Sequence, residues 1–227
     1  GEWGGMSAYG SLAVSYDRLT GDVPYGEILA FVQTLLTERG ATPRSVLDLA
    51  CGTGSMSVLL AQAGYRVTGA DMSEEMLTVA YDKAVALPDN RPFFVCQNME
   101  RLCLPEPVDW VLCCLDSINY LTDPAACQET FRRVYRSLCP GGVFIFDVNT
   151  PEKLRAMDGQ VFLDETEDTY CVWRTEYRRG LCTYYMDLFT LAEDGSWDRS
   201  FELHRQRGYS VEQLTRWLEE AGFADVR

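Results

Sequence analysis

Apolar runs and amphipathic segments alternate along the chain from about residue 25 to residue 148. Apolar residues at helical spacing predict a helix over Tyr25–Arg39, which Gly40 ends. Further helices are expected at Ser55–Ala63, Ser73–Ala86 and Pro124–Leu138. The expected strands are Ser45–Ala50, Arg66–Ala70, Pro92–Cys96, Val108–Leu115 and Val143–Val148. Continuously apolar strands that alternate with helices are typical of a doubly wound, mostly parallel α/β sheet covered on both faces.

The pattern changes after the fifth of these strands. From about Val161 to Gly208, polar and apolar residues alternate with the period of a half-buried strand. Turn residues at Arg179-Gly180 and Asp194-Gly195 divide this part into three expected strands: Thr169–Tyr177, Leu181–Leu191 and Ser196–Gln206. The sequence therefore predicts an antiparallel β meander inserted after the parallel sheet.

Helical spacing returns at the end of the chain. Ser210 is expected to cap a helix over Val211–Glu220, and Phe223–Arg227 is interpreted as the start of another strand of the sheet. The chain accordingly divides into four parts: an N-terminal segment with a capping helix (1–40), an α/β core (41–160), an inserted antiparallel β subdomain (161–208) and a C-terminal return to the core (209–227).

Acidic residues outnumber basic ones, 34 to 20, which gives a formal net charge of -14. Such a field repels phosphate backbones, so a broad nucleic-acid surface is not expected, although tRNA stays open as a substrate. The arginines at 178, 179, 205 and 207 fit a solvated strand face. The charge therefore favours a small-molecule or protein substrate.

The nine cysteines do not suggest a disulfide scaffold. Their number is odd, none forms a Cys-x-x-Cys pair, and the chain has one histidine, so we expect free thiols, a cytoplasmic location and no metal site. No run of 18 apolar residues occurs, and no secretory signal is expected. An expression scar at Gly1–Gly5, ahead of a natural start at Met6, is one interpretation of the first residues.

The first candidate ligand-binding motif is the turn after the first strand, Asp48-Leu-Ala-Cys-Gly52-Thr-Gly54. Glycines have no Cβ, so the backbone can turn tightly and approach a ligand. The turn lies at the carboxyl end of its strand, where open α/β sheets bind ligands. About 20 residues further on, Asp71 ends the second strand, where a carboxylate can accept hydrogen bonds from ribose hydroxyls. Its alternative role is to cap the following helix.

A dinucleotide site would need a third glycine, and Met56 and Ser57 stand in that part of the turn. A ligand with an adenosyl ribose and a cationic amino-acid tail fits better. Asp48 also suits a sulfonium or ammonium group better than a phosphate.

These motifs resemble those of class I S-adenosylmethionine-dependent methyltransferases. Val46–Gly54 is similar to motif I of that family, and Gly69–Met76 is similar to motif II. Gln97–Met99 resembles the stretch that contacts the adenine amino group, with Asn98 where the family usually has aspartate. Leu115–Tyr120 resembles the segment that faces the methionine portion. The resemblance implies a Rossmann-like methyltransferase sheet with S-adenosylmethionine as cofactor.

The resemblance extends to a bacterial subgroup of small methyltransferases of undefined substrate. It rests on the opening Tyr16-Asp17-x-Leu19 and on a Glu-x-His-x-Gln-Arg stretch, found here at Glu202–Arg207. The residues and the resemblance together indicate these cofactor-binding residues: Tyr16, Asp48, Ala50, Cys51, Gly52, Gly54, Asp71, Met72, Met76, Asn98, Met99, Leu115, Asp116 and Asn119.

Methyl transfer requires alignment of the acceptor with the methyl group, and a base where the acceptor arrives protonated. His204, the sole histidine, is the first candidate base, and Tyr16 and Tyr120 are candidates for the methyl-transfer pocket. Structural roles for all three stay open. The meander is interpreted either as a lid or as a homodimer interface. Two alternative functions for the whole chain also stay open: a non-catalytic S-adenosylmethionine-binding or partner-binding module, and a nicotinamide-dependent oxidoreductase.

Overall fold

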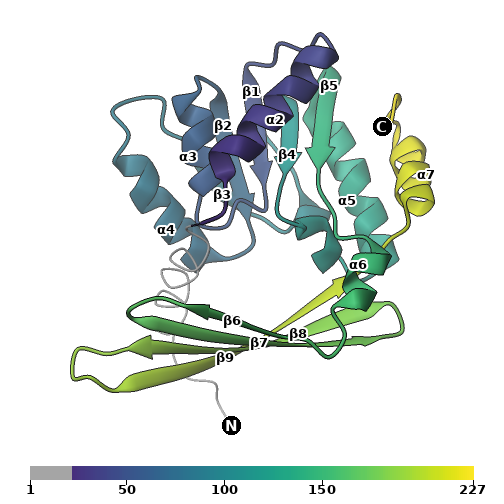
Figure 1. Ribbon diagram of the computed structural model, residues 1–227. Coiled ribbons are helices and arrows are strands. Elements are labelled where there is room, and N and C mark those ends of the chain that lie inside the picture. The colour runs from purple at the N-terminus through teal and green to yellow at the C-terminus, as the bar shows by residue number, and fades with distance from the viewer. Residues whose placement is uncertain (1–21) are drawn as a thin grey trace.

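A computed structural model describes residues 22–227 (Figure 1). Its core is a five-stranded parallel sheet with the order β3-β2-β1-β4-β5. The strands are β1 Ser45–Leu49, β2 Arg66–Asp71, β3 Phe93–Cys96, β4 Val108–Cys113 and β5 Leu138–Phe146. Strand order reverses beside β1, as in doubly wound folds. The prediction of a doubly wound parallel sheet is confirmed.

Helices cover the sheet on both faces because side chains of the central strands alternate. Val46 of β1 packs in one cluster with Trp110 of β4, whereas Leu47 and Val111 pack in the cluster on the other face. Helices α2 (Tyr25–Glu38) and α3 (Ser55–Gln62) cover the first face, and α5 (Pro124–Ser137) and α7 (Val211–Ala221) cover the second. Helix α4 (Glu74–Val85) packs beside α3 and β3.

The predicted meander is a separate four-stranded antiparallel sheet with the order β6-β7-β8-β9. Its strands are β6 Val161–Glu165, β7 Thr169–Arg178, β8 Leu181–Leu191 and β9 Trp197–Arg207. The short helix α6 (Pro151–Ala156) connects it to β5. Figure 1 shows this second sheet lying across the core at the ends to which β4 and β5 point. The carboxyl ends of the core strands therefore face the second sheet.

Three sequence predictions about elements differ from the structure. Strand β6 had no predicted counterpart because all five of its residues are exposed and show no alternation. Strand β5 begins at Leu138, before the expected Val143, because Leu138 pairs with Val108 across a register shift. The predicted strand at Phe223–Arg227 is wrong, because Phe223 packs edge to face against the ring of Tyr135 instead of extending the sheet.

One buried side chain joins the core to the second sheet. Asn119 lies in the 3-10 helix η2 (Ser117–Tyr120), after β4, and is fully buried. Its Nδ2 donates to the carbonyl oxygens of Asn149 and Arg207, both at 3.0 Å, and its Oδ1 accepts from the Asn149 amide at 2.8 Å. Asn149 follows β5 and Arg207 ends β9, so one amide group holds three segments together.

We predict that Asn119→Ala lowers the free energy of unfolding by about 2–4 kcal/mol, because it leaves buried backbone groups without partners. Denaturant unfolding measures the change. The control is Thr78→Ala on the exposed side of α4, where the hydroxyl bonds only within its own helix; its expected effect is below about 0.5 kcal/mol. Equal effects for the two variants would contradict the bridging role.

Candidate functional site

The turn after β1 uses the left-handed backbone region three times, at Ala50 (φ 57), Gly52 (φ 54) and Gly54 (φ 81). A Cβ on Gly54 would lie 2.7 Å from the Cβ of Ala80, so this glycine is needed where α3 packs on α4. A Cβ on Gly52 would meet no described atom within 4 Å. Gly52 therefore leaves the backbone open to a ligand, whereas Gly54 serves close helix packing.

Asp71 connects this turn to the end of β2. Its Oδ2 accepts a hydrogen bond from the Gly52 amide and its Oδ1 accepts one from the Ser73 amide, both at 2.9 Å. The Ser73 hydroxyl caps α4 by accepting from the Met76 amide at 3.2 Å. Each carboxylate oxygen keeps a further lone pair, so Asp71 can shape the loop and still accept a ligand hydroxyl.

The other residues predicted along this edge lie in the loops that follow β1, β2 and β3. The Met72 side chain is 70% exposed and offers apolar surface beside Asp71. The Cys51 amide donates to the carbonyl oxygen of Ala70 at 3.0 Å. Asn98 caps the 3-10 helix η1 (Met99–Arg101), its Oδ1 accepting from the Glu100 amide at 3.2 Å. Met99 packs against the core.

Asp48 lies beneath the turn and is 2% exposed. Its Oδ2 accepts a hydrogen bond of 2.6 Å from the Ser57 hydroxyl. Burial raises the pKa of Asp48 to about 7, against the lowering effect of the Ser57 hydrogen bond; the charge of Asp71 adds to the increase. Asp48 is thus a buried carboxyl that titrates near neutral pH.

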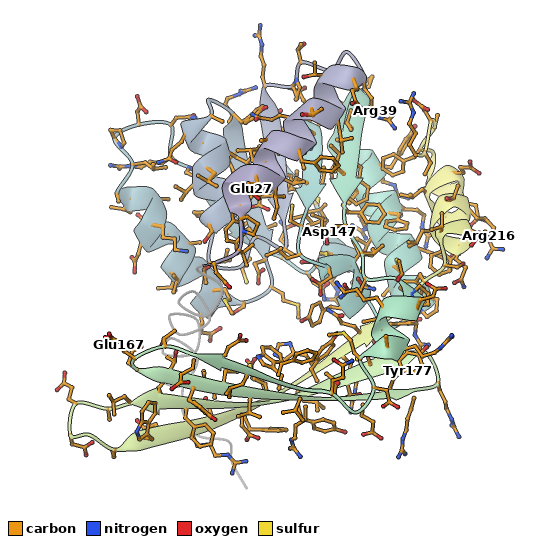
Figure 2. All side chains as sticks on the ribbon, in the orientation of Figure 1. Glu27, Arg39, Asp147, Glu167, Tyr177 and Arg216 are labelled. Carbon is orange, nitrogen blue, oxygen red and sulfur yellow. The ribbon has the colours of Figure 1, made fainter. Side chains whose placement is uncertain are left out.

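The loop after β4 contains two consecutive non-glycine residues in the left-handed region, Leu115 (φ 59) and Asp116 (φ 52). Both of their amides donate to the carboxylate of Asp147, at 2.8 and 2.5 Å. Figure 2 labels Asp147 just beyond β5, on the side of the core that faces the second sheet. The sequence prediction did not include Asp147, although its position at the carboxyl end of the fifth strand is a detectable signal.

Asp116 is in turn bonded to the second sheet. Its carboxylate accepts from Nε2 of Gln206, a fully buried residue of β9. The sequence analysis included Gln206 in the Glu202–Arg207 stretch but not among the site residues. The Oε1 of Gln206 accepts from Nδ2 of Asn149 at 3.0 Å and from the Tyr184 hydroxyl at 3.2 Å. Burial raises the pKa of Asp116, which the Gln206 hydrogen bond partly counteracts.

Two of the predicted catalytic residues meet at this junction. The rings of Tyr120 and His204 lie 5.8 Å apart between centroids, edge to face, although one belongs to η2 and the other to β9. The Trp173 ring lies 5.9 Å from His204. His204 Nε2 and Glu202 Oε2 are 2.6 Å apart. Tyr16, the third predicted residue, lies outside the described residues.

The chain is similar to known proteins in both sequence and fold. The methyltransferase domain family matches residues 46–142. Proteins of Geobacillus sp. (strain WCH70) and Bacillus subtilis (strain 168), both with the provisional name of methyltransferase, are 36% and 34% identical. Each alignment covers 95% of this chain, and 88% and 86% of the respective relative. A crystal structure of an S-adenosylmethionine-dependent methyltransferase from Clostridium acetobutylicum superposes with a TM-score of 0.84 at 29% identity, over 95% of this chain and 87% of that one.

The chain belongs to the class I S-adenosylmethionine-dependent methyltransferases. The predictions of family, enzyme activity and S-adenosylmethionine as cofactor are confirmed. The match also favours this activity over the oxidoreductase interpretation, which the missing third glycine already opposed. A sugar N-methyltransferase from Streptoalloteichus sp. shares the fold, with a TM-score of 0.80 at 23% identity over 98% of this chain and 86% of that one.

The cofactor fits the residues at the carboxyl edge of this methyltransferase. Gly52 leaves open space above the turn, and Asp71 presents carboxylate lone pairs beside it. Within residues 22–227 no helix is long and apolar enough to cross a membrane. The same residues contain no group of three or more acidic, cysteine or histidine side chains placed to hold a metal ion.

We predict that the methyltransferase loses stability as the pH rises from about 4 to about 7, because the Asp48 carboxyl ionises at lower pH in the unfolded chain than in the folded one. The folded pKa of Asp48, about 7, lies above the ordinary value of 3.8, so its contribution is full below about pH 4 and is lost as the pH rises through 7. Asp48→Asn removes this dependence. Between pH 5.5 and pH 8, the free energy of unfolding of the variant should rise by about 2 kcal/mol relative to that of the wild type, at about 1.4 kcal/mol per pKa unit.

Denaturant unfolding at both pH values measures this gain. Asp89→Asn, at an exposed position, is the control and should follow the wild type. A constant difference between Asp48→Asn and the wild type would show that the Asp48 carboxyl does not titrate in this range.

Proposed function

We propose that this methyltransferase methylates a small molecule held where the loops after β1, β2 and β4 face the second sheet. The main support for this proposal is the contact between Tyr120 and His204, because it joins a core loop to β9 at the edge where α/β sheets bind ligands. The net charge of -14 further disfavours a polyanionic substrate. Neighbours of the same fold are named as a sugar N-methyltransferase and an amino pentose methyltransferase, which agrees with a small acceptor.

We assign the cofactor-binding roles from the resemblance to the family. Asp71 would accept from the ribose hydroxyls, and the backbone at Ala50–Gly54 would hold the amino-acid tail. Met72, Met76, Asn98 and Met99 would contact the adenine. Leu115 and Asp116 would contact the methionine portion, and Asp48 supports the turn through Ser57.

Asn119 has a different role in this proposal. Its amide oxygen and nitrogen are both used by backbone partners, so we assign it to positioning the loop and not to cofactor contact. The predicted contact from Tyr16 stays a prediction.

The cofactor, when bound, supplies a methyl group on a sulfonium that needs no acid to leave. The chain's own residues orient the acceptor, exclude water and take its proton. His204 is the proton acceptor in this proposal; the rings of Tyr120 and Trp173 flank it, and its side chain is 27% exposed. Glu202 orients the imidazole through the 2.6 Å contact.

We also propose a cytoplasmic location. All nine cysteines are free, which suits a reducing compartment. A homodimer stays a prediction.

The test of the proposed function is an assay of the purified protein with methyl-labelled S-adenosylmethionine and the small-molecule fraction of a bacterial extract. We expect label in a small product that mass spectrometry can identify. A protein that binds S-adenosylhomocysteine but transfers no label to this fraction would contradict a small-molecule acceptor.

We predict that Asp71→Asn weakens the binding of S-adenosylhomocysteine by about 1–3 kcal/mol, the range for a lost charge-assisted hydrogen bond. Asparagine keeps one acceptor oxygen for the Gly52 amide and loses the one that serves the Ser73 amide, whereas alanine would lose both. Calorimetry measures the affinity, with Asp82→Asn on the exposed side of α4 as the control. Unchanged affinity in Asp71→Asn would remove the ribose role.

A further inference from the structure

The side of the second sheet that faces the core carries aromatic and acidic groups. Tyr184 pairs with His204 across β8 and β9, and Trp173 and Glu202 are in register with the same residue of β8. Glu202, His204 and Gln206 alternate along β9, so they share one face. Gln206 reaches a carboxylate of the core loop, which identifies this face as the one turned toward the core.

Aromatic rings surround the imidazole on this face. Tyr120 approaches from the core at 5.8 Å, and Trp173 lies at 5.9 Å on the neighbouring side. Trp173 also meets the Tyr184 ring edge to face at 6.2 Å. The faces of tryptophan and tyrosine rings attract cations, most strongly where water is excluded. A positively charged group beside His204 would therefore be stabilised.

The charged groups around the rings are mostly negative. Glu202 lies against His204, and Asp116 and Asp147 lie on the core side at the same junction. Lys153 is the cation whose charge acts on Asp116. A carboxylate or phosphate on the acceptor would be repelled here, and an ammonium would be attracted.

The Glu202–His204 pair is also arranged to take a proton. A carboxylate can only accept, so its 2.6 Å contact favours the tautomer that carries hydrogen on Nε2. The lone pair is then on Nδ1, and within residues 22–227 no hydrogen bond reaches this atom. Nδ1 is thus free to accept a proton from a bound group.

Resting on the proposed function, we propose that the acceptor is a small molecule with a primary or secondary amine. This face binds the amine as an ammonium ion, and the enzyme methylates its nitrogen. The rings and carboxylates select the charged form, and His204 converts it to the nucleophile. A neutral hydroxyl would use His204 as a base but would gain no charge attraction from the rings and carboxylates.

The reaction balances with the groups named. The ammonium loses a proton to Nδ1 of His204, which leaves a lone pair on nitrogen. The nitrogen–carbon bond then forms as the carbon–sulfur bond breaks, with the electron pair going to sulfur. The products are the methylated ammonium and S-adenosylhomocysteine, and His204 returns its proton to water.

The experiment divides one small-molecule extract into two portions. One portion is first acetylated with an amine-reactive succinimidyl ester, and both are then incubated with the enzyme and methyl-labelled S-adenosylmethionine. We expect a labelled N-methyl product from the untreated portion and loss of that label after acetylation. Equal label in both portions, or label on oxygen, would overturn the amine proposal and leave the proposed function standing. No label in either portion would overturn the proposed function itself, and this inference with it.

Variants then test the residues with the labelled fraction. His204→Gln should lower kcat about 100-fold, the lower range for a general base, with unchanged affinity for S-adenosylhomocysteine. Glu202→Gln should raise KM for the amine as well as lower kcat, because it removes a negative charge. Arg205→Gln is the control, since Arg205 is exposed and alternates to the opposite face of β9. An unchanged kcat in His204→Gln would remove this histidine from proton transfer.

Discussion

The site depends on the carboxylate of Asp147. Leu115 and Asp116 both hold the left-handed backbone conformation, which costs roughly 1–2 kcal/mol for each residue with a side chain. Hydrogen bonds from their two amides to one charged group offset this cost, because bonds to charged groups are among the stronger ones in proteins. The chain can therefore reverse at the end of β4 without glycine. This reversal sets the direction in which the chain continues from Asp116 to Tyr120.

The reversal determines how the two sheets meet. It turns Asp116 toward Gln206 and Asn119 toward the backbone at Asn149 and Arg207. Asn119 and Gln206 are buried and Asp116 is partly buried, so each would be costly without its partner. The aromatic contact between η2 and β9 follows from the same attachment. The proposed acceptor site is therefore a product of the junction, and neither sheet contains it alone.

The sequence predicted the parts that depend on local patterns. The glycine turn, Asp71 at the end of β2 and the Ser73 cap follow from residue types within a few positions of each other. Asp147 and Gln206 were not predicted as site residues. The end of a strand marks the position of Asp147, but their partners lie 32 and 90 positions away, and no local pattern marks these contacts. The strand prediction at Phe223 failed for the same reason, since an edge-to-face contact with the distant Tyr135 ring takes the place of strand pairing. Tyr120 and His204 were found separately, and only the fold brought them together.

The attachment at the end of β9 also has a mechanical consequence. Gln206 and the Arg207 carbonyl anchor that end, and the strand runs 11 residues from there to Trp197. At about 3.3 Å per residue, the sheet extends roughly 35 Å from its anchor. A tilt of about 10° at that pivot would displace the far turn by about 6 Å, while His204, two residues from Gln206, would move by little more than about 1 Å. A rotation of the second sheet about this attachment would therefore move its far turn widely and leave the proposed acceptor site almost in place.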